Sequence, residues 1–175
     1  MKSKLLIIII VNSISIIHAQ NVIEVSYSDT SYTYILFERC LKDSLPDGQY
    51  MLYFPTEKHS NESKIKEIAH YKNNVRDGIH IEYGINEDIY YLHKLEYYKN
   101  GILDGQSLVF YLDGSIILSG FFHDGKRIGK WQWKREKGNY ILNYNEFGNI
   151  TSWQCFDDSN KLLSEGEGSP GFIFP

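Results

Sequence analysis

The sequence predicts an all-β fold, an elongated antiparallel sheet of successive β-hairpins. Aromatic residues make up 15% of the 175 residues, and 14 Tyr and 14 Gly stand against only 4 Pro. This balance favours strands and tight turns over helices. Hydrophobic residues at 42% and charged residues at 23% are typical of a folded globular chain, and the length predicts one modest domain. The third observation is a turn-centred pattern that recurs along the chain.

The N-terminus resembles a secretory signal peptide. Lys2 and Lys4 precede an uninterrupted apolar run from Leu5 to Val11, and the small residue Ala19 suits a cleavage point. The run is too short to span a bilayer, and no later window could do so. We therefore expect residues 1–19 to be removed and the mature chain to be periplasmic or extracellular, without a transmembrane segment. The alternative is a buried N-terminal strand.

The repeat appears as four gapless windows of 14 residues, which begin at Leu41, Tyr71, Tyr98 and Phe122. Each window has Gly in its eighth place, at Gly48, Gly78, Gly105 and Gly129. These internal repeats predict how the chain is organised. We predict a lead-in strand region over residues 20–40, hairpin repeats over 41–163 and a C-terminal tail over 164–175.

Asn-Gly and Asp-Gly dipeptides explain the turns of the repeat. Asn100-Gly101 and Asp124-Gly125 supply the positive φ angles that a two-residue hairpin turn demands. The second glycine, four residues later, predicts a β-bulge or a close backbone approach as the next strand begins. We therefore assign structural turn roles to a set of glycines: Gly48, Gly78, Gly101, Gly105, Gly125 and Gly129.

Alternation beyond each second glycine predicts the outgoing strand. Between Gly129 and Arg135, Trp131 and Trp133 share one face, and Lys130, Gln132 and Lys134 share the other. The incoming strands are expected in 64–74, 91–101 and 115–125. Residues 56–69 could instead form a short helix, but we favour a strand from Lys64. A further turn is expected at Asp113-Gly114. Turns at 145–148 and at 157–160 indicate a degenerate last copy over 137–165.

The pattern Tyr-x-Asn-Gly-x-x-x-Gly followed by an alternating aromatic strand resembles the MORN-variant repeat. The resemblance covers residues 41–163 and implies a twisted meander of hairpins with a non-catalytic binding or scaffolding role. Bacterial members of this group are often labelled antitoxins of toxin–antitoxin pairs. The expected signal peptide does not fit that label, because toxin–antitoxin pairs usually act in the cytoplasm.

We predict no catalytic and no metal-binding residues in this sequence, and no cofactor is expected. The histidines left after signal removal lack the i, i+2 or i, i+4 spacing of paired metal ligands. Residues 166–171 match G-x-G-x-x-G, but only four residues follow, too few for the helix of a dinucleotide site. Asp47, Asp77 and Asp104 each precede the repeat glycine, which predicts acceptors for turn amides rather than an acid–base pair.

One strand carries a candidate binding patch, because cations crowd around two tryptophans: Lys126, Arg127, Lys130, Trp131, Trp133, Lys134 and Arg135, with Lys137 beyond them. It could contact an acidic partner through cations and ring faces. The alternative is a purely structural role, in which the two tryptophans pack against the next hairpin and the lysines are exposed to solvent.

The charge of the chain limits the class of partner that we expect. The formal net charge is −4, and loss of Lys2 and Lys4 makes the chain more acidic, so nucleic acid is not expected as a partner.

Cys40 and Cys155 lack a metal or redox spacing, and we favour free thiols over a disulfide. Asn61 and Asn149 match the glycosylation pattern.

Together these features predict an exported, non-enzymatic repeat protein that binds a protein or a polymer. A protein partner is expected first, with an anionic polysaccharide or a lipid headgroup next. The alternatives are an antitoxin or immunity-type protein that neutralises a toxin, and a small cell-envelope carbohydrate hydrolase. A hydrolase would need two carboxylates about 5–10 Å apart in a cleft.

Overall fold

The computed structural model describes residues 6–10, 13–18, 21–27, 35–42, 45–54, 64–135 and 138–171. These residues form strands, turns and bends without any helix, which confirms the predicted all-β class. Accordingly, the described part of the chain offers no helix long and apolar enough to cross a bilayer. The chain divides into two compact units, Met1–Tyr83 and Gly84–Pro175, and the division falls inside β7.

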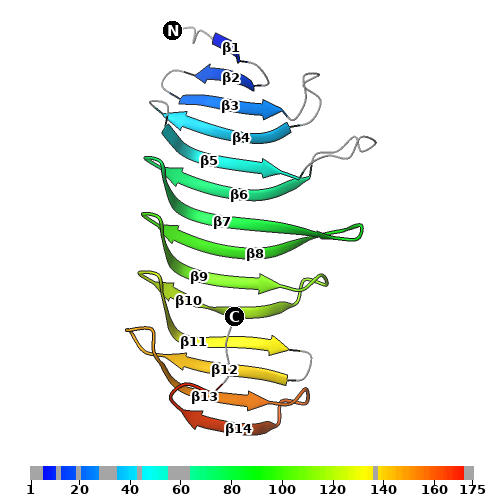
Figure 1. The fold of residues 1–175 in the computed structure, drawn as a ribbon, viewed down its shortest axis with the longest axis vertical. Coiled ribbons are helices and arrows are strands. Elements are labelled where there is room, and N and C mark those ends of the chain that lie inside the picture. The colour runs from blue at the N-terminus through cyan, green and yellow to red at the C-terminus, as the bar shows by residue number, and fades with distance from the viewer. Residues whose placement is uncertain are drawn as a thin grey trace. The chain divides into compact units, whose positions relative to one another are not determined.

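The first unit is a meander in which each strand pairs antiparallel with its neighbours in the chain (Figure 1). Its strands are β1 (Leu6–Ile10), β2 (Ser13–His18), β3 (Asn21–Tyr27), β4 (Ile35–Lys42), β5 (Leu45–Tyr53), β6 (Ile65–Lys72) and β7 (Val75–Asn86). The strand favoured from Lys64 is thus present as β6. β1 and β2 lie within the expected signal peptide, whose cleavage stays a prediction.

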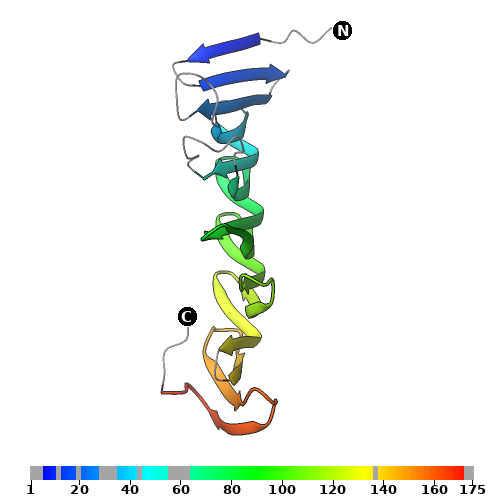
Figure 2. The ribbon, with the colours of Figure 1, turned by 90° about the vertical axis from the view of Figure 1, so that its right-hand side faces the viewer.

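The second unit repeats this arrangement, and Figure 2 shows its strands as strongly curved ribbons. Its strands are β8 (Ile89–Lys99), β9 (Ile102–Phe110), β10 (Ile116–His123), β11 (Lys126–Arg135), β12 (Gly138–Tyr144), β13 (Ile150–Phe156) and β14 (Leu162–Glu167). The expected last copy corresponds to β12–β14. The predicted tail from Ser164 begins inside β14, so part of it is a paired strand.

The predicted hairpin turns have the backbone that their residues demand. Asn100 and Gly101 have φ angles of 49° and 83°, and Asp124 and Gly125 have 48° and 75°. Two consecutive positive φ angles define the tight turn whose twist matches that of the flanking strands. The flanking pairs Lys99 with Ile102 and His123 with Lys126 show that each turn has two residues.

The second glycine of the repeat marks both a register shift and a close approach. At Gly105 φ is 129°, and a Cβ there would lie 2.8 Å from Tyr97 Cβ. The register of β8 and β9 changes between the pairs Tyr98–Leu103 and Glu96–Ser107, which places a bulge at this glycine. The bulge predicted at the second glycine is therefore confirmed here, and the close approach is to the side chain of Tyr97.

A row of side chains across the strands forms the core of each unit, and its members alternate in size. In the first unit fully buried Ala69 lies opposite His80, which is 2% exposed. In the second unit Glu96 lies opposite Ser107. The ring of Trp131 lies directly over Gly120, where a Cβ would overlap it. A thin sheet thus fills its interior by setting a large residue against a small one.

Polar contacts complete the core of the first unit. Glu67 Oε1 accepts a hydrogen bond from Arg76 Nη2 at 2.6 Å and lies 3.1 Å from His80 Nε2. The hydrogen bond with His80 is the main cause that lowers the pKa of Glu67, and the charge of Arg76 adds to it. A half-buried carboxylate is thereby held in its charged form.

The predicted turns of the last copies are present. Gly114 N donates to Tyr111 O at 3.0 Å, and Gly148 N donates to Asn145 O at 3.1 Å. The 157–160 turn is held by Asp157 Oδ1, which accepts from the backbone amides of Ser159 and Lys161, both at 2.9 Å. A hydrogen bond from the Ser159 hydroxyl is the main cause that lowers the pKa of Asp157, and the two backbone hydrogen bonds add to it. The turn after β13 is therefore fixed by its own side chain.

Cys40 and Cys155 are both free thiols. Of the two glycosylation-type asparagines, Asn149 is exposed and Asn61 lies outside the described residues, as does Lys137.

Candidate functional site

The candidate patch on β11 is divided between two faces of the sheet. Successive side chains of a strand point to opposite faces. Trp131 and Trp133 therefore share one face, with Arg127 and Arg135, whereas Lys130 and Lys134 lie on the other. Lys126, at the start of β11, is exposed. No single surface presents the tryptophan rings together with the lysines.

Trp131 is a core residue. It is 2% exposed, and its Nε1 donates to Phe121 O at 3.2 Å. Its ring meets Phe122 edge to face at 5.0 Å between centroids, and the Arg127 guanidinium lies 4.8 Å from the ring centre. With these contacts and Gly120 beneath it, the ring has no face left for a ligand. For Trp131 the structure matches the packing alternative.

Trp133 lies in a second aromatic group on the same face. Its ring centroid is 5.7 Å from that of Tyr140, and the Arg135 guanidinium lies 4.6 Å from the Trp133 ring centre. A hydrogen bond with the Cys155 thiol, followed by burial, raises the pKa of Tyr140. The Trp133 ring thus already has Arg135 and Tyr140 as neighbours within the protein.

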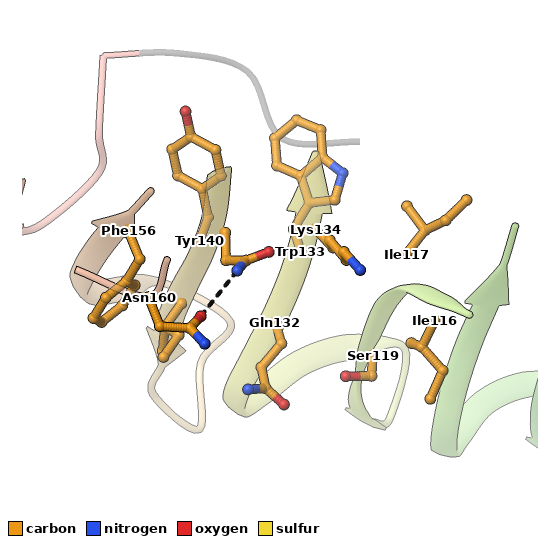
Figure 3. Close-up of a pocket in the computed structure, with 11 residues that line it drawn as sticks. Ile116, Ile117, Ser119, Gln132, Trp133, Lys134, Tyr140, Phe156 and Asn160 are labelled. Atoms are coloured by element: carbon orange, nitrogen blue, oxygen red, sulfur yellow. Dashed lines mark hydrogen bonds between the residues drawn. The ribbon is translucent and has the colours of Figure 1, made fainter. Parts of the chain in front are cut away.

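A groove of about 350 Å³ lies across β10–β13, and Trp133 and Tyr140 line it together with residues of the opposite face. Direct cross-strand pairs set its floor: Ser119 with Gln132, Gln132 with Ile141, and Lys134 with Asn139. Figure 3 shows the rings of Trp133 and Tyr140 on one side of the strands and the side chain of Gln132 on the other. The volume lies near the lower end of the range of about 300–1,000 Å³ for ligand pockets.

The end wall of the groove comes from the turn after β13. Asn139 Nδ2 donates to Asn160 Oδ1 at 3.2 Å (Figure 3). Asn139 also lies directly opposite Phe156, which adds an aromatic ring to the lining. Since Asp157 fixes the turn, Asn160 is held in place before any ligand arrives.

The sequence identified Trp133 and Lys134, which both line the groove, but it missed the other residues that form it. Asn139, Ile141, Phe156 and Asn160 belong to other strands and turns, so spacing along the chain gives no signal for them. The antiparallel register places them beside Lys134. A sequence signal would require the register of β11, β12 and β13, which the degenerate last copy does not show.

The predicted role of the repeat aspartates is confirmed at two positions. Asp47 Oδ2 accepts from the amide of Asn73 at 3.2 Å, and Asp104 Oδ2 accepts from the amide of Asp124 at 3.2 Å. In each case the aspartate of one hairpin holds the turn of the next. These side chains therefore link successive repeats rather than stabilise only their own turn.

One of these contacts also gathers potential metal ligands. Asp104, His123 and Asp124 bring ligand atoms within 4.8 Å of one another, and His123 Nδ1 lies 3.1 Å from Asp104 Oδ2. Spacing along the chain cannot predict this cluster, because Asp104 belongs to a different hairpin from the other two. His123 and Asp124 are exposed, and the turn hydrogen bond alone accounts for the arrangement.

Comparison with known proteins adds little. No family model and no curated protein matches the chain. Among solved structures, the GtfA/B complex matches with 8% identity and a TM-score of 0.24 over 79% of this chain and 20% of that chain. The pneumococcal O-GlcNAc transferase GtfA in complex with UDP and GlcNAc matches with 7% identity and the same TM-score and coverage. The chain thus spans about a fifth of each, and likenesses this weak carry no argument about function.

Proposed function

We propose that this chain is an exported, MORN-like repeat protein without catalytic activity, which binds a partner through the groove face of β10–β13. The observation that carries the proposal is the groove itself. Its lining combines the amides of Gln132 and Asn139, the ammonium of Lys134 and the apolar side chains of Ile141 and Phe156. A concave surface with a few fixed polar groups on an apolar floor is typical of binding sites.

The fold supports binding in a second way. Gln132 and Lys134 lie on β11, which pairs with β10 and β12, so their backbone is fixed on both sides. A site built on paired strands loses little conformational entropy when a partner binds.

The lining favours binding over hydrolysis. Hydrolysis of a glycosidic bond uses two carboxylates that flank the bond. None of the lining residues within the described part of the chain is Asp or Glu. A second hollow, of about 370 Å³, does include Glu165 and Glu167. These two lie on one strand and are both exposed, whereas an acid and a base need unlike environments.

The test is capture of a partner by the purified chain from envelope and secreted fractions of its source. The groove variant carries Gln132→Ala and Lys134→Ala. The control carries Lys99→Ala and Gln106→Ala, which removes the same two kinds of exposed side chain outside the groove. Trp131 stays unchanged in every bait, because it is part of the core.

We expect the parent and the control to retain the same partner and the groove variant to lose it, with all three baits equally folded by circular dichroism. Treatment of the captured material with protease or with periodate then separates a protein from a glycan. Retention of the partner by the groove variant, or capture of nothing by the parent, would contradict the proposal.

A further inference from the structure

The polar lining of the groove consists mainly of side-chain amides. Gln132, Asn139 and Asn160 provide them, and Ser119 adds a hydroxyl. An amide presents a donor and an acceptor side by side, and a hydroxyl is both at once. The Asn139–Asn160 hydrogen bond uses one polar atom of each amide, and each has a second that this bond does not use. Such a lining suits a ligand rich in hydroxyl groups.

The backbone of these strands is not available to an extended peptide. β11 pairs with β10 and β12, and β12 pairs with β11 and β13. Peptides that add a strand to a sheet need an open edge, where main-chain hydrogen bonds provide the affinity. At the groove, recognition must come from side chains alone. This arrangement favours a ligand that is read through its own substituents.

The floor of the groove also has apolar side chains among its polar ones, from Ile117, Ile141 and Phe156. A sugar ring has hydroxyls around its rim and C–H groups on its faces. It can therefore place one face on this floor while its rim meets the amides. An acyl chain would leave those amides desolvated without partners, which costs free energy.

The charge of the groove adds a further requirement for the ligand. Lys134 is the only charged side chain among the described residues that line the groove, and it interacts electrostatically with the carboxylate of Asp113 outside that lining. Lys130 lies four residues earlier on the same face of β11 and adds a second positive charge there, in a chain with a net charge of −4. An anionic group on the ligand would pair with Lys134 through a charge-assisted hydrogen bond.

We infer that the groove binds a saccharide that carries a carboxylate, with Lys134 contacting the carboxylate and Gln132 and Asn139 contacting ring hydroxyls. The inference rests on the proposed binding function and names its ligand class. The ring lies on Ile141 and Phe156, and Asn160 closes the end of the site.

The test uses isothermal titration calorimetry with a panel of uronic acid oligosaccharides: oligomers of galacturonate, mannuronate and guluronate, and hyaluronan. Each is titrated as the free acid and as its methyl ester, which removes the charge and leaves the ring. The proteins are the parent chain, Lys134→Gln and the control Lys99→Gln. Both lysines are exposed, so neither change disturbs packing.

We expect at least one free acid to bind the parent and Lys99→Gln equally. Its methyl ester should bind the parent about tenfold more weakly or worse, as loss of a charge-assisted hydrogen bond predicts. Lys134→Gln should weaken binding of the acid by a similar factor and should no longer distinguish acid from ester. That loss of discrimination assigns Lys134 to the carboxylate, because a general disturbance of the groove would weaken both ligands.

Three results would overturn the inference: no panel member binds the parent, acid and ester bind the parent equally, or Lys134→Gln still favours the acid. If none binds but the capture experiment still yields a partner that depends on the groove and is destroyed by protease, the binding function stands and its ligand is a protein. If capture also fails, the proposed function itself falls.

Discussion

Gly120→Ala tests the large-against-small packing of the core. At an ordinary strand position this change should stabilise the protein by about 0.5–1 kcal/mol, because alanine loses less conformational freedom on folding. Gly120 has no positive φ angle, so the backbone accepts an alanine. A Cβ at this position, however, would overlap the ring of Trp131. The packing therefore predicts that the substitution lowers the stability of the protein, whereas the backbone predicts that it raises the stability.

The overlap should decide the outcome. Trp131 cannot move aside cheaply, because it is 2% exposed, donates a hydrogen bond to Phe121 O and packs against Phe122. Overpacking of a filled core costs about 1–3 kcal/mol. After the backbone gain is subtracted, we expect Gly120→Ala to lower the free energy of unfolding by about 1 kcal/mol or more.

Urea denaturation followed by circular dichroism measures this loss. With a slope of about 1–3 kcal/mol per molar urea, a loss of 1 kcal/mol moves the midpoint down by about 0.3–1 M. The matched background is Trp131→Leu, which removes the ring. There Gly120→Ala should be neutral or stabilising, and the cycle should give a coupling of about 0.5–3 kcal/mol. A stabilising effect of Gly120→Ala beside the native Trp131 would refute the packing argument.

Three further changes test other contacts. Glu67 has a lowered pKa in the folded state, so its stabilising effect is present above its unfolded pKa of about 4.3 and is lost as the pH falls through the folded value. Glu67→Gln should thus flatten the fall in stability below about pH 4.3 in acid titrations followed by circular dichroism, and an unchanged acid profile would contradict the assigned contacts. Asp104→Ala should cost about 0.5–1.5 kcal/mol in urea, whereas Asp104→Asn, which keeps an acceptor, should cost less; equal costs would argue against the turn hydrogen bond. Gly105→Ala combines a φ of 129° with a Cβ only 2.8 Å from Tyr97 Cβ, so its thermal midpoint should fall further than that of Gly114→Ala, which has open space around it.

Much of the fold could be predicted from local chemistry. Asn100-Gly101 and Asp124-Gly125 specify their turns because few other residue pairs accept two consecutive positive φ angles. The bulge at Gly105 also follows from its place in the repeat. The expected tail boundary at Ser164 was less accurate, since β14 continues to Glu167. Pairing with β13, rather than any local preference, extends that strand.

The candidate site was predicted only in part. Alternation correctly separated Trp131 from Lys130, but it could not show that Trp131 is buried over Gly120. Nor could it show that Arg135 and Tyr140 already stack on Trp133. Burial depends on what lies across the strand, and that partner is distant in sequence.

The sequence by itself determined the all-β class, the hairpin repeat and the positions of its turns, because turn geometry depends on residues that are adjacent in the chain. Only the tertiary structure decided which side chains meet. The bulges of β8–β9 and β10–β11 each shift the register between strands by two residues, so cross-strand neighbours cannot be counted from the repeat alone. The groove beside Lys134, the aspartate contacts between hairpins and the pairing of Trp131 with Gly120 all depend on that register.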